Sequence, residues 1–169
     1  MPHKTIYVQS LSFPIMPNIQ IHWSCPGKYI NDFRAHRDRA LATPPAFMQR
    51  SLASYMDTTQ HKKDIFATGR KLGDTCALVR EAVEQSFPEG TYVSSPEGGC
   101  ALWVGLPESV NCHLLADEAK ANNISISVAS DYRAHGNWII INYSTIALNG
   151  NLLAGVNKLG ALACRIEKR

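Results

Sequence analysis

The sequence predicts an α+β protein in which helices cover one face of a small antiparallel or mixed sheet. The chain has 169 residues, of which 45% are apolar, so it can bury one proper core. Long stretches with apolar residues every three or four positions indicate amphipathic helices, and short runs of β-branched and aromatic residues indicate strands. After two N-terminal strands, the expected order is helix, helix, strand, strand, helix, strand, strand, helix.

Two short strands are expected at the N-terminus. Residues 5–11 are rich in β-branched and aromatic types, and residues 19–24 repeat this composition. A two-stranded sheet cannot bury both of its faces. We therefore expect these strands to pack on the rest of the chain, on a second copy of it or on another polypeptide.

Helices are expected over much of the following sequence. Residues 28–55 show helical spacing of apolar side chains, interrupted at Pro44 and Pro45, where proline ends one helix and can begin another at its first turn. A second helical run covers residues 59–87 and ends at Pro88.

The second half predicts strands and helices in alternation. In chain order these are a buried strand at 100–106, a helix capped by Ser109 or Asn111, strands at 124–128 and 138–143, and an amphipathic helix at about 151–166. Apolar and polar residues alternate strictly at 124–128, as in a half-buried strand.

Composition argues against several classes of function. The net charge is +3 with both signs well mixed, so we expect no direct binding of nucleic acid or of an anionic membrane. No apolar run is long enough to span a membrane and the N-terminus does not resemble a signal peptide, so we expect a cytoplasmic protein. The five cysteines are odd in number and widely spaced, and the histidines lack metal-ligand spacing, so we expect reduced thiols and no metal site.

The N-terminal segment from Ser10 to Trp23 carries a resemblance to a known family. It reads Ser-Leu-Ser-Phe-Pro-Ile-Met-Pro-Asn-Ile-Gln-Ile-His-Trp and resembles the segment of class I/II pyridoxal-phosphate (PLP) aminotransferases of fold type I that contains Ser-x-Ser-Lys and Pro-Gly-x-Arg-x-Gly. In that family the lysine forms the Schiff base with PLP and the arginine holds the cofactor phosphate. Phe13 stands at the lysine position and Gln20 at the arginine position, while Ser10 and Ser12 stand at family phosphate-site positions. A phenyl ring cannot form an imine, and a neutral amide cannot replace a guanidinium group.

A second segment extends the resemblance into the C-terminal half. Residues 95–107 are similar to the family's Pro-x-Gly-Gly-x-x-x-Trp-x-x-Leu-Pro motif, especially in MocR-type regulators of the GntR family, which join a winged helix-turn-helix to an aminotransferase-like body. The resemblance covers about residues 4–167. It implies remnant strands of a large PLP domain at 1–27, an interdomain helical region at 28–58 and an aminotransferase-like small domain at 59–169.

A third segment concerns the substrate carboxylate. The run Ile139 to Tyr143 resembles the family's Leu-Arg-Leu-Asn-Tyr, in which the arginine grips that carboxylate, so Ile140 takes the arginine's place. We interpret the three replacements as loss of transamination and expect no catalytic residue, no substrate-binding residue and no covalently bound PLP. Lys28 is expected at a helix start facing water, which argues against it as a substitute lysine. Cys100 is either a reactive thiol beside a base or, as we favour, a buried inert thiol.

These observations favour a non-catalytic aminotransferase-like domain of a transcriptional regulator that serves dimerisation or effector sensing. Because family members pair through their large domains, we expect a homodimer, and a separate polypeptide could supply a large domain or a DNA-binding segment. One alternative is a PLP-dependent aminotransferase subunit or fragment that acts with a separate large-domain polypeptide. Another is an interaction domain with no small ligand.

Overall fold

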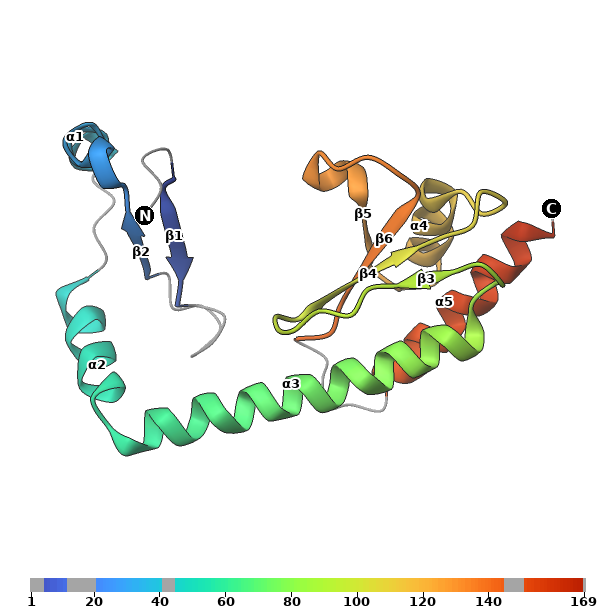
Figure 1. Cartoon of the computed structure of the whole chain (residues 1–169), viewed down its shortest axis with the longest axis horizontal. Coiled ribbons are helices and arrows are strands. Elements are labelled where there is room, and N and C mark those ends of the chain that lie inside the picture. Colours follow the sequence, from blue (N-terminus) through green and yellow to red (C-terminus); the bar gives the residue numbers. More distant parts are fainter. Residues whose placement is uncertain (1–4, 12–20, 41–44, 145–150, 169) are drawn as a thin grey trace. The chain divides into compact units, whose positions relative to one another are not determined.

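The computed structural model describes residues 5–11, 21–40, 45–144 and 151–168 (Figure 1). The chain divides into two compact units, Met1–Thr68 and Gly69–Arg169, and the division falls within the long helix α3 (Thr59–Ser86). The family-based division into 1–27, 28–58 and 59–169 remains a prediction.

The first unit begins with a two-stranded antiparallel sheet. Strands β1 (Tyr7–Ser10) and β2 (His22–Cys25) pair along their whole length. A short 3-10 helix, η1 (Gly27–Tyr29), leads into α1 (Ile30–Ala40), and α2 (Ala46–Met56) follows. Pro45 precedes α2 with an extended ψ of 136°, which agrees with a helix that begins after this proline, while Pro44 lies outside the described residues.

The first unit has a small core and a large apolar surface. Within its described residues, Leu11 and Leu52 are the buried centre of the core, with Ile21, Met48, Tyr55 and Met56 packed around them. Ten large apolar side chains among the residues described in this unit are exposed: Ile6, Tyr7, Val8, Trp23, Tyr29, Ile30, Phe33, Phe47, Ile65 and Phe66.

The second unit is built on a four-stranded antiparallel sheet with strand order β3-β4-β6-β5. The strands are β3 (Tyr92–Val93), β4 (Ala101–Gly105), β5 (Ser127–Val128) and β6 (Trp138–Asn142). The strand expected at 124–128 is thus shorter than its alternation predicts. The Ile124 N–H bonds the Ala119 carbonyl at the end of the preceding helix (2.9 Å), so the segment enters the sheet only from Ser127 on.

Helices cover one face of this sheet. They are the C-terminal part of α3, α4 (Cys112–Ala121) and α5 (Asn151–Glu167). Asn111 caps α4, because its Oδ1 accepts hydrogen bonds from the backbone N–H groups of His113 (2.9 Å) and Leu114 (3.1 Å). Among the described residues, no helix is long and apolar enough to cross a membrane.

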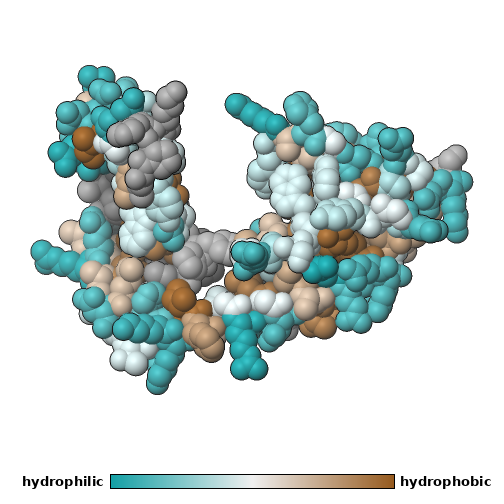
Figure 2. All heavy atoms as spheres, in the orientation of Figure 1, coloured by the Kyte–Doolittle hydropathy of each residue, from teal (hydrophilic) through white to brown (hydrophobic). Residues whose placement is uncertain are grey.

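The main core lies between the sheet and these helices. Alternate strand residues such as Leu102 and Val104 are fully buried there against Val79, Val83 and Leu159 of the helices. In Figure 2 the hydrophobic residues (brown) of this unit gather between the sheet and α3, while hydrophilic residues (teal) form its rim.

Candidate functional site

The structure describes two of the five residues that the sequence places at family site positions. Ser12, Phe13 and Gln20 lie outside the described residues. Ser10 ends β1 opposite His22 and is half-buried, and Ile140 lies in the middle of β6. These two residues belong to different units.

The register of the sheet decides where Ile140 points. It is directly opposed by Trp103 on β4 and by Ser127 on β5. Its chain neighbours Ile139 and Ile141 belong to the main core, and successive strand residues point to opposite faces. Ile140 therefore lies on the side of the sheet away from the main core, which we call the outer face. Its side chain is nevertheless only 6% exposed.

No strand residue on the outer face carries a charge. The register places eight strand residues there: Tyr92, Ala101, Trp103, Gly105, Ser127, Trp138, Ile140 and Asn142. A carboxylate bound over the middle of this face would meet no cationic partner from the strands, and burying an unpaired carboxylate is unfavourable.

Four aromatic rings cross the outer face as a continuous series, which we call the aromatic row. Tyr92 and Trp138 meet edge to face with ring centroids 5.8 Å apart, and Trp138 meets Trp103 in the same manner at 6.4 Å. Tyr132, the last residue of the 3-10 helix η2 (Ala129–Tyr132), lies 6.4 Å from Trp103 at a tilted angle. These separations are those of favourable aromatic pairs.

The thiol of Cys100, next to this face, is partly buried. Burial raises the pKa of Cys100, and a hydrogen bond with Ser144 only partly opposes the shift. Burial and a hydrogen bond with Cys76 also raise the pKa of Tyr143, whose hydroxyl donates to the Gly99 carbonyl (3.2 Å). Both groups therefore stay protonated at neutral pH, which fits the interpretation of Cys100 as an inert thiol. All five cysteines are free.

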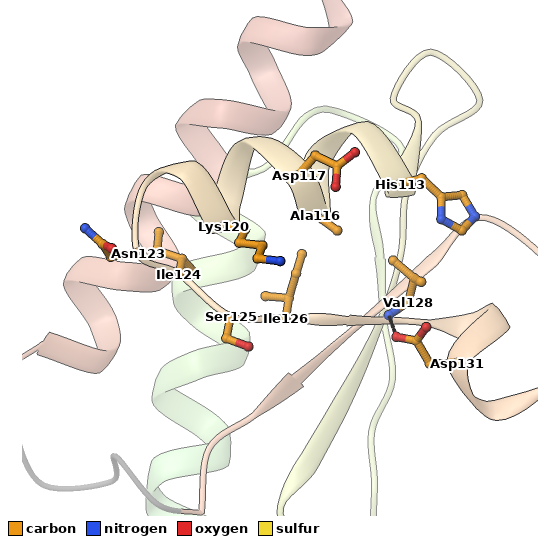
Figure 3. A pocket seen from close by; sticks show the side chains of 10 residues that line it. All are labelled: His113, Ala116, Asp117, Lys120, Asn123, Ile124, Ser125, Ile126, Val128 and Asp131. Carbon is orange, nitrogen blue, oxygen red and sulfur yellow. Dashed lines mark hydrogen bonds between the residues drawn. The ribbon is translucent and has the colours of Figure 1, made fainter.

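A second feature is an open depression of about 760 Å³ between α4 and the segment that leads into η2 (Figure 3). His113, Asp117 and Lys120 contribute polar side chains from one face of α4. The other lining residues are Ala116, Asn123, Ile124, Ser125, Ile126, Val128 and Asp131. Asp131 is committed to the fold, because its Oδ2 accepts a hydrogen bond from the Val128 N–H (3.0 Å). The spacing of the three polar residues on α4 is the sequence signal that could have indicated this depression.

Within the part of the chain that the structure describes, no group of three or more His, Cys, Asp or Glu side chains could hold a metal ion.

Comparisons with known proteins agree on one architecture. The chain is 20% identical to the kynurenine aminotransferase of Pyrococcus horikoshii, whose crystal structure it matches with a TM-score of 0.84 over 97% of this chain and 41% of that chain. The chain has the fold of the C-terminal part of a fold type I PLP-dependent aminotransferase. No protein-family model matches this aminotransferase-like chain.

Two curated relatives of the aminotransferase-like chain are regulators. The uncharacterized HTH-type transcriptional regulator YdfD of Bacillus subtilis is 23% identical over 97% of this chain and 34% of its own length. The uncharacterized HTH-type transcriptional regulator YjiR of Escherichia coli is 24% identical over 80% of this chain and 29% of its own length. These matches confirm the resemblance to the aminotransferase-like body of such regulators, and the chain spans about a third of their length.

The lysines of the aminotransferase-like chain that the structure describes all lie at the surface. A Schiff-base lysine is activated by desolvation or by a neighbouring cation, and every lysine among the described residues is exposed to solvent. Lys28 lies in η1 with its Nζ 5.1 Å from the centroid of the adjacent Tyr29 ring, as expected of a surface side chain.

Proposed function

We propose that this chain is a non-catalytic aminotransferase-like module of a transcriptional regulator, which serves dimerisation or effector sensing in place of transamination. The observation that carries the proposal is the position of Ile140. It stands where the family's carboxylate-binding arginine is expected, at the centre of a sheet face whose strand residues are all uncharged. An amino-acid substrate would lose its main ionic contact on this face.

The exposed lysines support the same proposal. The family reaction needs a lysine nitrogen that is deprotonated and held beside the cofactor. Among the described residues no lysine is shielded from water, and the sequence has Phe13 at the expected position. We therefore expect that neither PLP nor an amino-acid substrate is held covalently by this chain.

The apolar surface of the first unit supports a role in association. Its two-stranded sheet exposes Val8 on one face and Tyr7 and Trp23 on the other, while its core contains only two buried apolar side chains among the described residues. Two strands that expose apolar side chains gain stability by packing on another surface. A second copy of the chain would bury this surface symmetrically, in keeping with the prevalence of twofold symmetry among homo-oligomers.

Incubation of the purified chain with PLP tests the proposal against the alternative of an aminotransferase subunit. We expect no stoichiometric aldimine absorption band, and after borohydride reduction we expect only scattered labelling of surface lysines. A Lys28→Ala variant serves as control, because it should label like the parent chain at every other lysine. A stoichiometric band that borohydride fixes at one lysine would overturn the proposal and favour the enzyme alternative.

A further inference from the structure

The aromatic row is held in place by two glycines that contact one indole ring. A Cβ on Gly105 would lie 3.0 Å from Cζ3 of Trp138, and a Cβ on Gly136 would lie 2.7 Å from its Nε1. Gly136 also has a φ of +105°, a conformation that side chains disfavour. Both ends of the Trp138 indole therefore lie against backbone that has no side chain, which fixes the ring across the outer face.

The two tryptophans of the row retain unused hydrogen-bonding capacity. Neither indole N–H has a hydrogen-bond partner among the described residues, although the third tryptophan, Trp23, donates its Nε1–H to Gln9 (3.0 Å). Trp103 and Trp138 are only partly buried, whereas Tyr92 and Tyr132 at the ends of the row are 61% and 62% exposed. The row thus offers ring faces, ring edges and the Trp103 N–H donor to a molecule outside the fold.

Two charged residues adjoin one end of the row in the chain. Asp131 and Arg133 flank Tyr132, and the Asp131 carboxylate already bonds the Val128 N–H. The centre of the row, where Trp103 and Trp138 meet beside Ile140, has no charged neighbour from the strands. Electrostatic complementarity at that centre therefore favours a ligand without a formal charge.

We propose that the aromatic row is a binding site for a neutral planar heteroaromatic ring that carries a hydrogen-bond acceptor. The ring would lie against Trp103 and Trp138 at the centre of the row, with its acceptor facing an indole N–H, and the exposed tyrosines would close its two ends. A carboxylate on the ligand weakens binding, because Ile140 offers it no partner. This inference deepens the proposed function, since it names the chemical class of the effector.

The three tryptophans allow a direct test with an internal control. Quinoline, which is neutral at neutral pH and has one ring-nitrogen acceptor, is titrated into ¹⁵N-labelled full-length chain while the indole N–H signals are followed by NMR. Tryptophan-to-phenylalanine variants assign the three signals. We expect saturable shifts for Trp103 and Trp138 in the millimolar range and no shift for Trp23. Quinoline-4-carboxylate, which has the same ring, is expected to bind several-fold more weakly.

Exposed residues of the row supply variants that should fold normally. Tyr92→Ala and Tyr132→Ala are each expected to weaken quinoline binding several-fold, and Tyr29→Ala, which changes an exposed tyrosine of the first unit, should leave it unchanged. Equal shifts of all three indole signals, equal affinity for the carboxylate or the absence of saturation would each overturn the inference. The PLP experiment measures modification of lysines, whereas the quinoline titration measures binding to the aromatic row. A failure of one prediction can therefore be distinguished from a failure of the other.

Discussion

Gly160 of α5 lies against Ser86, the last residue of α3, so closely that no side chain fits between the two helices. A Cβ on Gly160 would lie 2.5 Å from both the carbonyl oxygen and the hydroxyl oxygen of Ser86. The Ser86 hydroxyl donates to the Ala82 carbonyl (2.6 Å), and the thiol of Cys164 contacts the Ser86 carbonyl at 3.6 Å. Because backbone atoms cannot move aside as a flexible side chain can, the contact between Gly160 and Ser86 sets how closely α5 packs against α3.

The Gly160→Ala variant should consequently be less stable than the parent chain. We expect the free energy of unfolding to fall by about 1–3 kcal/mol, the usual cost of overpacking a core. Gly155→Ala is the matched control on the same helix, because no neighbouring atom lies within 4 Å of its added Cβ. Replacing a helical glycine by alanine there should stabilise the chain by roughly 0.5–1 kcal/mol. Urea denaturation followed by circular dichroism measures both, and equal effects would contradict the packing argument.

Asn137 joins the end of β4 to the start of α4. Its side-chain amide donates to the carbonyls of Pro107 (2.9 Å) and Val110 (2.7 Å), and its Oδ1 accepts from the Cys112 N–H (3.0 Å). Asn137→Ala leaves these partly buried backbone groups unpaired, so we expect a loss of about 1–3 kcal/mol of stability. Asn157→Ala, an exposed position on α5, is the control and should change stability little. An unfolding midpoint of Asn137→Ala equal to that of the parent chain would show that water replaces the hydrogen bonds of the Asn137 side chain.

Ile140→Arg would place an arginine where the family resemblance expects one. Because Ile140 is only 6% exposed and its strand neighbours on the outer face are uncharged, the guanidinium would lack a partner. We expect the free energy of unfolding to fall by about 2 kcal/mol, with no gain in transamination. Asn142→Arg, on the same strand and face but exposed, should be nearly neutral. Thermal unfolding measures the loss of stability, and an amino-acid turnover assay measures transamination. Measurable turnover by Ile140→Arg would contradict the proposed loss of catalysis.

The first unit should associate through its apolar strands. Size-exclusion chromatography with light scattering is expected to give twice the 18.6 kDa mass of the chain. Val8 on β1 is 62% exposed, so Val8→Lys should raise the monomer fraction by placing a charge on the apolar surface. Leu114→Lys on α4 in the second unit, where the side chain is 41% exposed, is the control and should leave the dimer intact. A monomeric parent chain at tens of micromolar would refute the predicted homodimer.

A hydrogen bond between Tyr55 and Asp64 links α2 to α3 and depends on pH. The Tyr55 hydroxyl donates to the Asp64 carboxylate (2.6 Å) and lowers the pKa of Asp64, with a smaller contribution from Gln60 (2.7 Å). Because the pKa is lower in the folded state, the bond stabilises that state above the ordinary aspartate pKa. Its contribution is lost as the pH falls through the depressed value.

Replacing Tyr55 tests this link. Tyr55→Phe should raise the pKa of Asp64 toward its ordinary value, as measured by NMR titration of the carboxyl carbon. Tyr29→Phe removes a hydroxyl elsewhere in the same unit and should leave the Asp64 titration unchanged. An identical Asp64 titration in Tyr55→Phe would show that the hydroxyl does not stabilise the carboxylate in solution.

The same hydrogen bond raises the pKa of Tyr55. The bond therefore stabilises the folded state below the ordinary tyrosine pKa, and this contribution is lost as the pH rises through the raised value. The link between α2 and α3 is therefore favoured between these two limits.

Sequence patterns were sufficient for the type and order of the elements. The helices beside Pro45, the cap at Asn111 and the strands around Trp103 and Ile140 all follow from short-range preferences of the backbone. Alternation at 124–128 correctly indicated which side chains pack on the core, since Ile124, Ile126 and Val128 do so. The alternation overestimated the length of this strand, because strand pairing also requires a neighbouring strand within hydrogen-bonding distance.

The family motifs marked Ile140, Phe13 and Gln20 as positions of interest in the sequence, but they did not indicate the surroundings of Ile140. Only the register between β4, β6 and β5 placed Ile140 beside Trp103 on the face away from the main core. The aromatic row, the contact between Gly160 and Ser86 and the hydrogen bonds of Asn137 likewise join residues far apart in the chain. Local preferences act over a few residues and so specify helices, caps and strands. Contacts across the chain depend on how those elements pack, which no short stretch of sequence encodes.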